Sequence, residues 1–220
     1  NYEWGLLVEG FDRPPMFMMT YNPPYYGELI EQAGFAKSQD LYAFWGHVDM
    51  VGSLSEKHKF IDEGIRERFG VVLREMDRRR FRTEVEMFLN MYNQALSGTW
   101  GFVPLSSGEI QQTAAELRHL IVPELSLVAE VEGKPIGMLF GLLDYNQPIR
   151  QMNGRLFPFG FLKLLTGRRN IKQMRVLSAN VLPEYQNWGI GISLARGLLA
   201  PVQQFGIQEV EFSWVLESNN

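Results

Sequence analysis

The fold is decided by residues 174–191, MRVLSANVLPEYQNWGIG. The apolar run at 174–182 predicts a strand, and the residues after the turn predict an apolar-periodic helix from Ile192. Gly189 and Gly191 lie between the two elements, where they let the backbone come close to a ligand and adopt positive φ angles. The first amides of a helix have no partner within it, and the helix dipole favours an anion there. We therefore interpret this turn as a candidate phosphate-binding site.

Composition indicates a folded globular protein. The chain has 220 residues, of which 45% are hydrophobic and 13% aromatic, enough for a substantial core. Its formal net charge of −4 argues against a nucleic-acid surface. Arg78, Arg79 and Arg80, with Arg82, form the one basic cluster, which we interpret as the solvated start of a helix.

Several kinds of site are not expected. The sequence has no cysteine, which excludes disulfides, a thiol nucleophile and a thiolate metal site. Its three histidines lack the spacing of paired metal ligands. The longest apolar run, at 136–143, is far shorter than the roughly 20 residues of a membrane-spanning helix, and the first ten residues do not resemble a signal peptide. We expect a cytoplasmic protein with no membrane span.

Periodicity predicts alternating helices and strands around the 174–191 segment. Residues 144–170 are irregular but aromatic, so we expect an ordered loop with a short helix at 161–165 that covers the sheet or a ligand. Pro201 should kink or shorten the last helix. We expect strands at 41–45, 71–76, 125–131, 135–143, 174–182 and 209–215, and helices at 22–33, 55–69, 79–96, 107–121 and 192–205.

This order of elements resembles the GCN5-related N-acetyltransferase (GNAT) superfamily. The six residues from Gln186 to Gly191 match its Q-x-x-G-x-G signature, and Glu217-Ser218-Asn219 resembles the E-x-N entrance to its next helix. Segments such as EVEGKPIGMLFGLLDYNQP and NGRLFPFG also resemble a bacterial subgroup of tandem GNAT-like proteins. The resemblance implies an α/β (α+β) fold, in which helices flank a mixed, mostly antiparallel sheet that is truncated at both ends.

The N-terminal residues resemble the end of another GNAT domain. A hydrophobic strand followed by an asparagine is expected twice, before Asn22 and before Asn219. We therefore predict the end of a first repeat at 1–46, a linker with a helix at 47–70, and a second domain at 71–220 that lacks its last helix and strands. Alternatively, residues 14–46 supply the missing helix and strand to the second domain, giving a permuted single domain. Pairing of 41–45 with 212–215 as its only sheet neighbour would favour that alternative.

The resemblance also implies a cofactor site for acetyl-CoA or another acyl-CoA. In the family, the strand that enters the glycine turn separates from its neighbour shortly before that turn. Here the corresponding residues are Ala179, Asn180 and Val181, and the resemblance implies that the backbone of Val181 pairs with the pantetheine and that its amide polarises the thioester carbonyl. The turn then holds the pyrophosphate, and Trp188 either stacks on the ligand or packs against the sheet. The cofactor-binding residues are expected to be Val181, Gln186, Asn187, Trp188, Gly189, Ile190, Gly191 and Asn219.

The general base is not identified by the resemblance. Many relatives carry a glutamate six residues before the valine, and Arg175 occupies that position here. We take Asp144 and Tyr145 as the candidate catalytic residues, with Glu130 and Glu211 also possible.

Polar residues of the long loop are expected to contact the acceptor, a small amine, an amino acid or a peptide. These are Asn146, Gln147 and Arg155. Two functions follow: an acyl-CoA-dependent N-acyltransferase that uses direct attack in a ternary complex, or a non-catalytic GNAT-like module that binds CoA or an acylated ligand or serves as a structural half of a tandem protein.

Overall fold

The protein folds around one six-stranded sheet, in a computed structural model that describes residues 5–50, 55–155, 157, 160 and 167–219. The strand order is β1-β6-β5-β4-β3-β2, with only β5 and β6 parallel. This mixed, mostly antiparallel sheet confirms the expected fold class. The strands are β1 (Leu41–His47), β2 (Val71–Glu75), β3 (Ile121–Val131), β4 (Lys134–Leu143), β5 (Gln173–Val181) and β6 (Glu209–Leu216).

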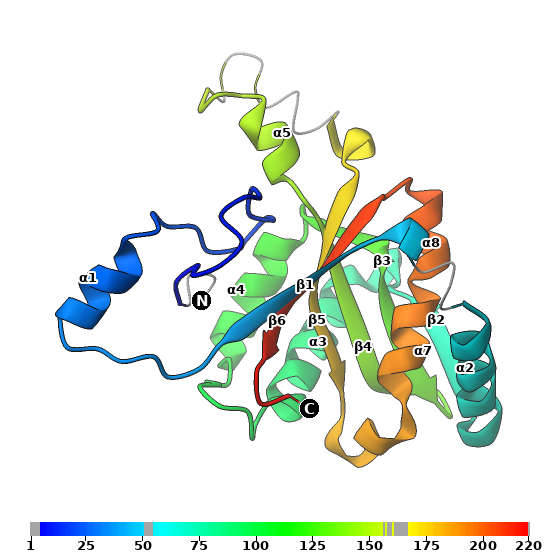
Figure 1. The fold of residues 1–220 in the computed structure, drawn as a ribbon. Coiled ribbons are helices and arrows are strands. Elements are labelled where there is room, and N and C mark those ends of the chain that lie inside the picture. Colours follow the sequence, from blue (N-terminus) through cyan, green and yellow to red (C-terminus); the bar gives the residue numbers. More distant parts are fainter. Residues whose placement is uncertain (1–4, 51–54, 156, 158–159, 161–166, 220) are drawn as a thin grey trace.

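Helices cover both faces of the sheet (Figure 1). One face packs against α3 and α4, and the other against α2, α7 and α8. The 310 turns η2 (Arg78–Arg80), η3 (Arg168–Asn170) and η4 (Pro183–Trp188) connect elements. The α-helices are α1 (Tyr26–Gln32), α2 (Ser55–Phe69), α3 (Phe81–Ala95), α4 (Ser107–Leu117), α5 (Asn146–Arg150), α7 (Ile190–Gly197) and α8 (Leu199–Gln204).

Alternation along the central strands divides the core into two parts. Leu139 and Leu143 of β4 pack beneath α7 and α8, whereas Met138, Phe140 and Leu142 pack beneath α3 and α4. This is the period of two that a strand with both faces buried requires. The apolar stripe predicted for α3 faces the second part, with Val85, Phe88 and Leu89 buried. The core therefore encloses β3, β4 and β5 between two layers of helices.

Local sequence signals explain several helix boundaries. Ser106 caps α4, because its hydroxyl accepts the amide of Glu109 while the Glu109 carboxylate accepts the amide of Ser106. The helix expected at 192–205 is divided at Leu198 into α7 and α8, with Pro201 inside the second part. The short helix expected at 161–165 lies outside the described residues. Within the described chain, none of the helices has the length and apolarity that a bilayer span demands.

The N-terminal region contributes an edge strand to the sheet. Residues 16–19 form a turn, closed by the bond from the Met19 amide to the Met16 carbonyl, in place of the strand predicted before Asn22. In the described part of the chain, β1 lies at the edge of the sheet and pairs antiparallel only with β6, so that Tyr42 faces Val215. This pairing is the one stated for the single-domain alternative, and the division at 1–46, 47–70 and 71–220 stays a prediction. The presence of a second repeat stays a prediction.

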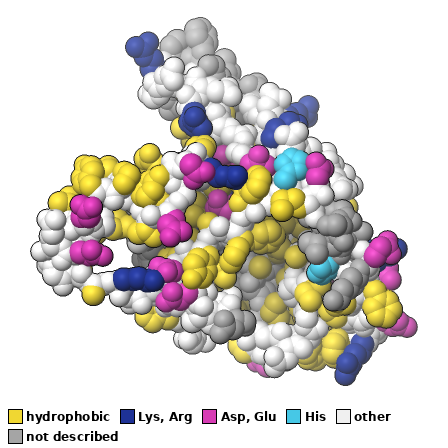
Figure 2. All heavy atoms as spheres, in the orientation of Figure 1, with side chains coloured by type: hydrophobic (Ala, Val, Ile, Leu, Met, Phe, Trp, Pro, Cys, Tyr) yellow, Lys and Arg dark blue, Asp and Glu magenta, His cyan; other side chains and the backbone are white. Residues whose placement is uncertain are grey.

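Helix α1 stands away from the sheet at the left of Figure 1. None of its residues is buried, and Tyr25 and Leu29 are more than half exposed. Figure 2 shows hydrophobic side chains gathered over this arm. The arm joins the rest of the fold through β1 and through residues 15–19, whose backbone bonds to Asp144, Asn146 and Arg175.

Candidate functional site

The glycine turn after β5 has the geometry of an anion site. Gly189 adopts φ 77° and ψ 17°, the left-handed region, and α7 begins at Ile190, two residues before the predicted start. A Cβ at Gly189 would lie 2.8 Å from Cδ1 of Ile65, so both conformation and packing require glycine there. A Cβ at Gly191 would meet open space. Gly191 is exposed, and the amides of Ile190 and Gly191, at the positive end of α7, have no partner within the helix.

Two side chains of the turn support its shape. Trp188 stacks on Phe69 of α2, with ring centroids 4.3 Å apart, and meets the ring of Tyr185 edge-on at 4.8 Å. Gln186 donates from Nε2 to the Val181 carbonyl at 3.3 Å. Asn187 is exposed. Of the two expectations for Trp188, packing within the fold is the one that the geometry favours.

Strands β5 and β6 diverge above this turn. Their parallel pairing extends only from Gln173–Glu209 to Val176–Phe212, after which β6 continues beside β1 and β5 continues beside β4. No described strand pairs with residues 177–181 on the β6 side. Ala179 is exposed there. The backbone of this segment can therefore pair with an extended ligand. The expected splay at 179–181 is present and begins two residues earlier.

Arg175 is buried at the point where β5 and β6 stop pairing. It is 2% exposed, its Nε donates to Ser213 Oγ at 2.7 Å, and its Nη2 donates to the Ser213 carbonyl at 3.2 Å. Its guanidinium carbon lies 5.1 Å from the ring centroid of Trp214. Burial lowers the pKa of Arg175 to about 10, against the opposing effect of Glu211, so the side chain is charged at neutral pH.

The hydroxyl of Ser213 links Arg175 to the carboxylate of Glu211 through two hydrogen bonds. Ser213 Oγ donates to Glu211 Oε1 at 2.7 Å while it accepts from Arg175. Glu211 is half-buried. The chain Arg175–Ser213–Glu211 therefore orients a carboxylate beside the point of strand divergence. Sequence reasoning left Glu211 among several candidates, because its place depends on where β5 and β6 stop pairing.

Asp144 and Asn146 hold residues 15–19, which we call the N-terminal strap. Asp144 Oδ1 accepts the amides of Phe17 at 2.9 Å and Asn146 at 3.2 Å. Asn146 Nδ2 donates to the Pro15 carbonyl at 2.9 Å, and Arg175 Nη1 donates to the Met18 carbonyl at 2.8 Å. Burial raises the pKa of Asp144, and the nearby charge of Glu211 adds to the shift. In this arrangement, the predicted base and acceptor residues bind the backbone of the chain itself.

Tyr145 and Glu130 are engaged in the fold. The Tyr145 hydroxyl donates to the Leu120 carbonyl at 3.3 Å, and burial raises the pKa of this phenol. A neutral, buried phenol is a poor base at neutral pH. Glu130 of β3 forms an ion pair with Arg74 of β2 at 2.7 Å. These strands lie at the opposite edge of the sheet from β6.

The predicted acceptor residues do not gather at the glycine turn. Gln147 donates to Gln173 Oε1 at 2.7 Å and accepts the Lys172 amide, which fastens α5 to the start of β5. Arg155 is exposed beyond α5. In Figure 1, α5 and the turn after β5 lie at opposite ends of the sheet. The nine residues of β5 separate the two ends, which corresponds to about 26 Å of strand.

Asn219 lies just beyond β6. It is exposed, and its amide donates to the Leu216 carbonyl at 2.9 Å. Among the described residues, no group of three or more His, Asp or Glu side chains is arranged to hold a metal ion.

The fold is that of the GCN5-related N-acetyltransferases. A member from Sphaerobacter thermophilus superimposes with a TM-score of 0.55 at 15% identity, over 89% of this chain and 49% of the other. This likeness and the mixed sheet flanked by helices together confirm the GNAT-like fold.

Two curated proteins are similar over the whole chain. Protein YghO of Escherichia coli (strain K12) is 35% identical over 226 residues, which are 57% of its length. Bacterial ceramide synthase of Caulobacter vibrioides (strain NA1000 / CB15N) is 34% identical over 226 residues, which are 58% of its length. The chain thus spans little more than half of these relatives. No protein-family model matches it.

Proposed function

We propose that this chain carries the acyl-CoA site of an N-acyltransferase that transfers an acyl group to an amine. The observation that supports the proposal most strongly is the end of β5–β6 pairing at Val176–Phe212, directly before a glycine turn that opens a helix. An exposed strand edge followed by free helix amides suits a ligand that has an extended amide-bearing arm and a pyrophosphate.

The binding mode uses the backbone more than side chains. Residues 177–181 pair with the pantetheine arm, and a backbone amide at the start of this segment polarises the thioester carbonyl, because Val181 lies six residues, about 20 Å of strand, beyond the register position of Glu211. The amides of Ile190 and Gly191 hold the pyrophosphate, since α7 itself supplies them no partner. Gln186 and Trp188 keep the turn in shape through Val181 and Phe69. Asn219 stays a predicted contact at the end of β6.

We propose Glu211 as the general base in preference to Asp144 and Tyr145. The carboxylate accepts a proton from the acceptor amine while the nitrogen forms a bond to the thioester carbon; the carbon–sulfur bond then breaks and the thiolate leaves, to be protonated. Ser213 and Arg175 orient Glu211 through the contacts at 2.7 Å. Asp144 is less suited, because two backbone amides of the described chain already occupy one of its oxygens.

The acceptor is proposed to be an amine. One relative is called bacterial ceramide synthase, and a ceramide is an amide of a long-chain amino alcohol, which supports N-acylation and acyl groups longer than acetyl. The alternative is a non-catalytic module that binds an acyl-CoA. Arg175 favours it, because a buried cation stands where many relatives of the fold carry the base.

The test is a titration of the full-length protein with acetyl-CoA and with longer acyl-CoAs, followed by transfer assays on a panel of amines. We expect saturable acyl-CoA binding, and a Glu211→Gln variant that binds normally but is about 10²–10⁴-fold slower. Glu209→Gln, on the same strand, is the matched control and should keep its rate. Absence of binding to every acyl-CoA would reject the cofactor site. Binding without transfer would favour the module, and a fully active Glu211→Gln would reject that base.

A further inference from the structure

A cationic pocket lies where α3 begins and α4 ends, apart from the acyl-CoA site. Its volume is about 850 Å³, and fourteen residues line it. Six of them are arginines and none is an aspartate or glutamate, although the whole chain carries a net charge of −4. The arginines are Arg78, Arg79, Arg80, Arg82, Arg118 and Arg168.

Carboxylates outside the pocket neutralise only part of this charge. Arg78 pairs with Glu124 at 2.5 Å, Arg80 with Asp77 at 3.1 Å, and Arg82 with Glu86 at 2.9 Å, and none of these three carboxylates lines the pocket. In the described chain, the guanidinium groups of Arg79 and Arg118 form no ion pair, although the Arg79 backbone amide donates to Asp77 Oδ1 at 2.8 Å. The Arg168 guanidinium donates to the Ile121 carbonyl at 2.8 Å. Three guanidinium groups of the pocket therefore form no ion pair within the described part of the chain.

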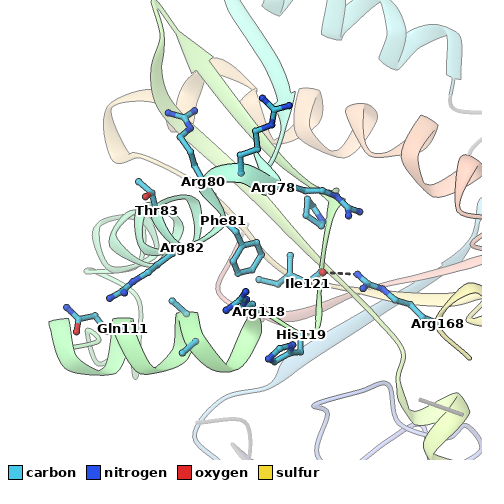
Figure 3. Close-up of a pocket in the computed structure, with 14 residues that line it drawn as sticks. Arg78, Arg80, Phe81, Arg82, Thr83, Gln111, Arg118, His119, Ile121 and Arg168 are labelled. Carbon is cyan, nitrogen blue, oxygen red and sulfur yellow. Dashed lines mark hydrogen bonds between the residues drawn. The ribbon is translucent and has the colours of Figure 1, made fainter. Parts of the chain in front are cut away.

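The uncompensated groups come from separate elements and border an apolar floor. Figure 3 shows Arg118, at the end of α4, and Arg168, on η3, on either side of Phe81 and Ile121. Phe81 is the first residue of the fifteen-residue helix α3, so the positive end of that helix dipole adds to the same field. Like charges held together in this way repel one another unless an anion binds among them.

We propose that this pocket binds the phosphate group of an amphiphilic ligand. Guanidinium groups match the oxygens of a phosphate in bidentate geometry. Three positive charges are more than the single negative charge of a carboxylate can neutralise, which favours a phosphate. The floor of Phe81, Ile121 and Pro123 accommodates an apolar neighbour of that phosphate. The basic run interpreted from the sequence as a solvated helix start thus contributes to a binding site, because the fold brings Arg118 and Arg168 beside it.

The phosphate group belongs either to a lipid headgroup or to a soluble ligand, and two binding measurements distinguish these sources. Full-length protein is titrated with inorganic phosphate and pyrophosphate, and is sedimented with vesicles of phosphatidylglycerol or of phosphatidylcholine. Preference for phosphatidylglycerol vesicles indicates a lipid headgroup, and saturable binding of the soluble ions alone indicates a soluble ligand. Binding of neither would overturn the proposal.

Variants test whether the pocket is responsible. Arg79→Ala and Arg118→Ala should each weaken vesicle binding by about fivefold, the usual effect of one basic residue near an anionic surface. Both residues are exposed, so these variants should fold. Lys134→Ala, an exposed lysine at the opposite end of the β3–β4 hairpin, is the control and should leave binding unchanged. An equal loss in Lys134→Ala would refute the pocket, whereas acyl-CoA binding should persist in all three variants.

Discussion

Replacement of Gly189 by alanine should lower the free energy of unfolding of the protein even when no ligand is bound. Gly189 has φ 77°, and an added Cβ would lie 2.8 Å from Cδ1 of Ile65. The left-handed conformation costs a non-glycine residue about 1–2 kcal/mol. Moving the Ile65 side chain away from its preferred rotamer adds about 1 kcal/mol. We therefore expect the free energy of unfolding to fall by about 2–3 kcal/mol, which lowers Tm by about 4–12 °C in a domain of this size.

The two contributions can be separated by urea denaturation of a double-mutant cycle. Ile65→Val removes the Cδ1 atom that the new methyl group would meet. On that background, Gly189→Ala should cost only the backbone part, about 1–2 kcal/mol. Wild-type stability of Gly189→Ala would refute the conformational argument. An undiminished cost in the Ile65→Val background would refute the contact argument.

Gly191→Ala is the matched control within the same turn. Its Cβ would meet open space in the first turn of α7, so we expect unchanged or slightly higher stability. The methyl group would stand where the phosphate is proposed to approach, and acyl-CoA affinity should fall roughly tenfold, as for one lost charge-assisted hydrogen bond. Loss of stability in Gly191→Ala together with unchanged acyl-CoA affinity would contradict this assignment of the two glycines.

Two further predictions concern buried carboxylates. Glu84 is 3% exposed, and its two carboxylate oxygens accept hydrogen bonds from Arg74 at 2.8 and 3.1 Å. Glu84→Gln should therefore lower the unfolding free energy, measured by urea titration, by about 2 kcal/mol. Glu86→Gln, in an exposed pair, should change it by less than about 0.5 kcal/mol. Burial raises the pKa of Asp144 in the folded state, so its contribution to stability is fully present below its unfolded pKa and is lost as pH rises through the folded value. Asp144→Asn keeps an oxygen for the amides of Phe17 and Asn146, and should therefore remove that pH dependence; parallel stability–pH curves for the two proteins would contradict it.

Most elements were predictable because their signals are local. The apolar periodicity at 79–96 predicted α3, and the apolar runs at 125–131 and 135–143 predicted the paired strands β3 and β4. The exact helix starts were less accurate, as at Ile190, because a capping glycine in the left-handed region determines the first residue.

The candidate site was only partly predictable. The phosphate turn follows from glycine spacing, but the roles of polar residues depend on which backbone groups they meet. Asp144 and Asn146 resemble loop residues that reach a ligand, whereas each bonds to the strap, more than 120 positions away along the chain. No sequence pattern indicates that contact, because it depends on the tertiary packing of residues 15–19 against Asp144, Asn146 and Arg175.

The sequence by itself determined the order of elements, the glycine turn, and the substitution of arginine for the usual acidic residue at 175, since propensity, periodicity and residue identity act over a few positions. Tertiary structure alone decided that β1 completes the edge of the sheet beside β6, that Glu211 stands next to the point of strand divergence, and that Arg118 and Arg168 join the basic run. The physical reason is that each of these relations is a contact between distant segments, and such contacts form only where packing and backbone pairing bring those segments together.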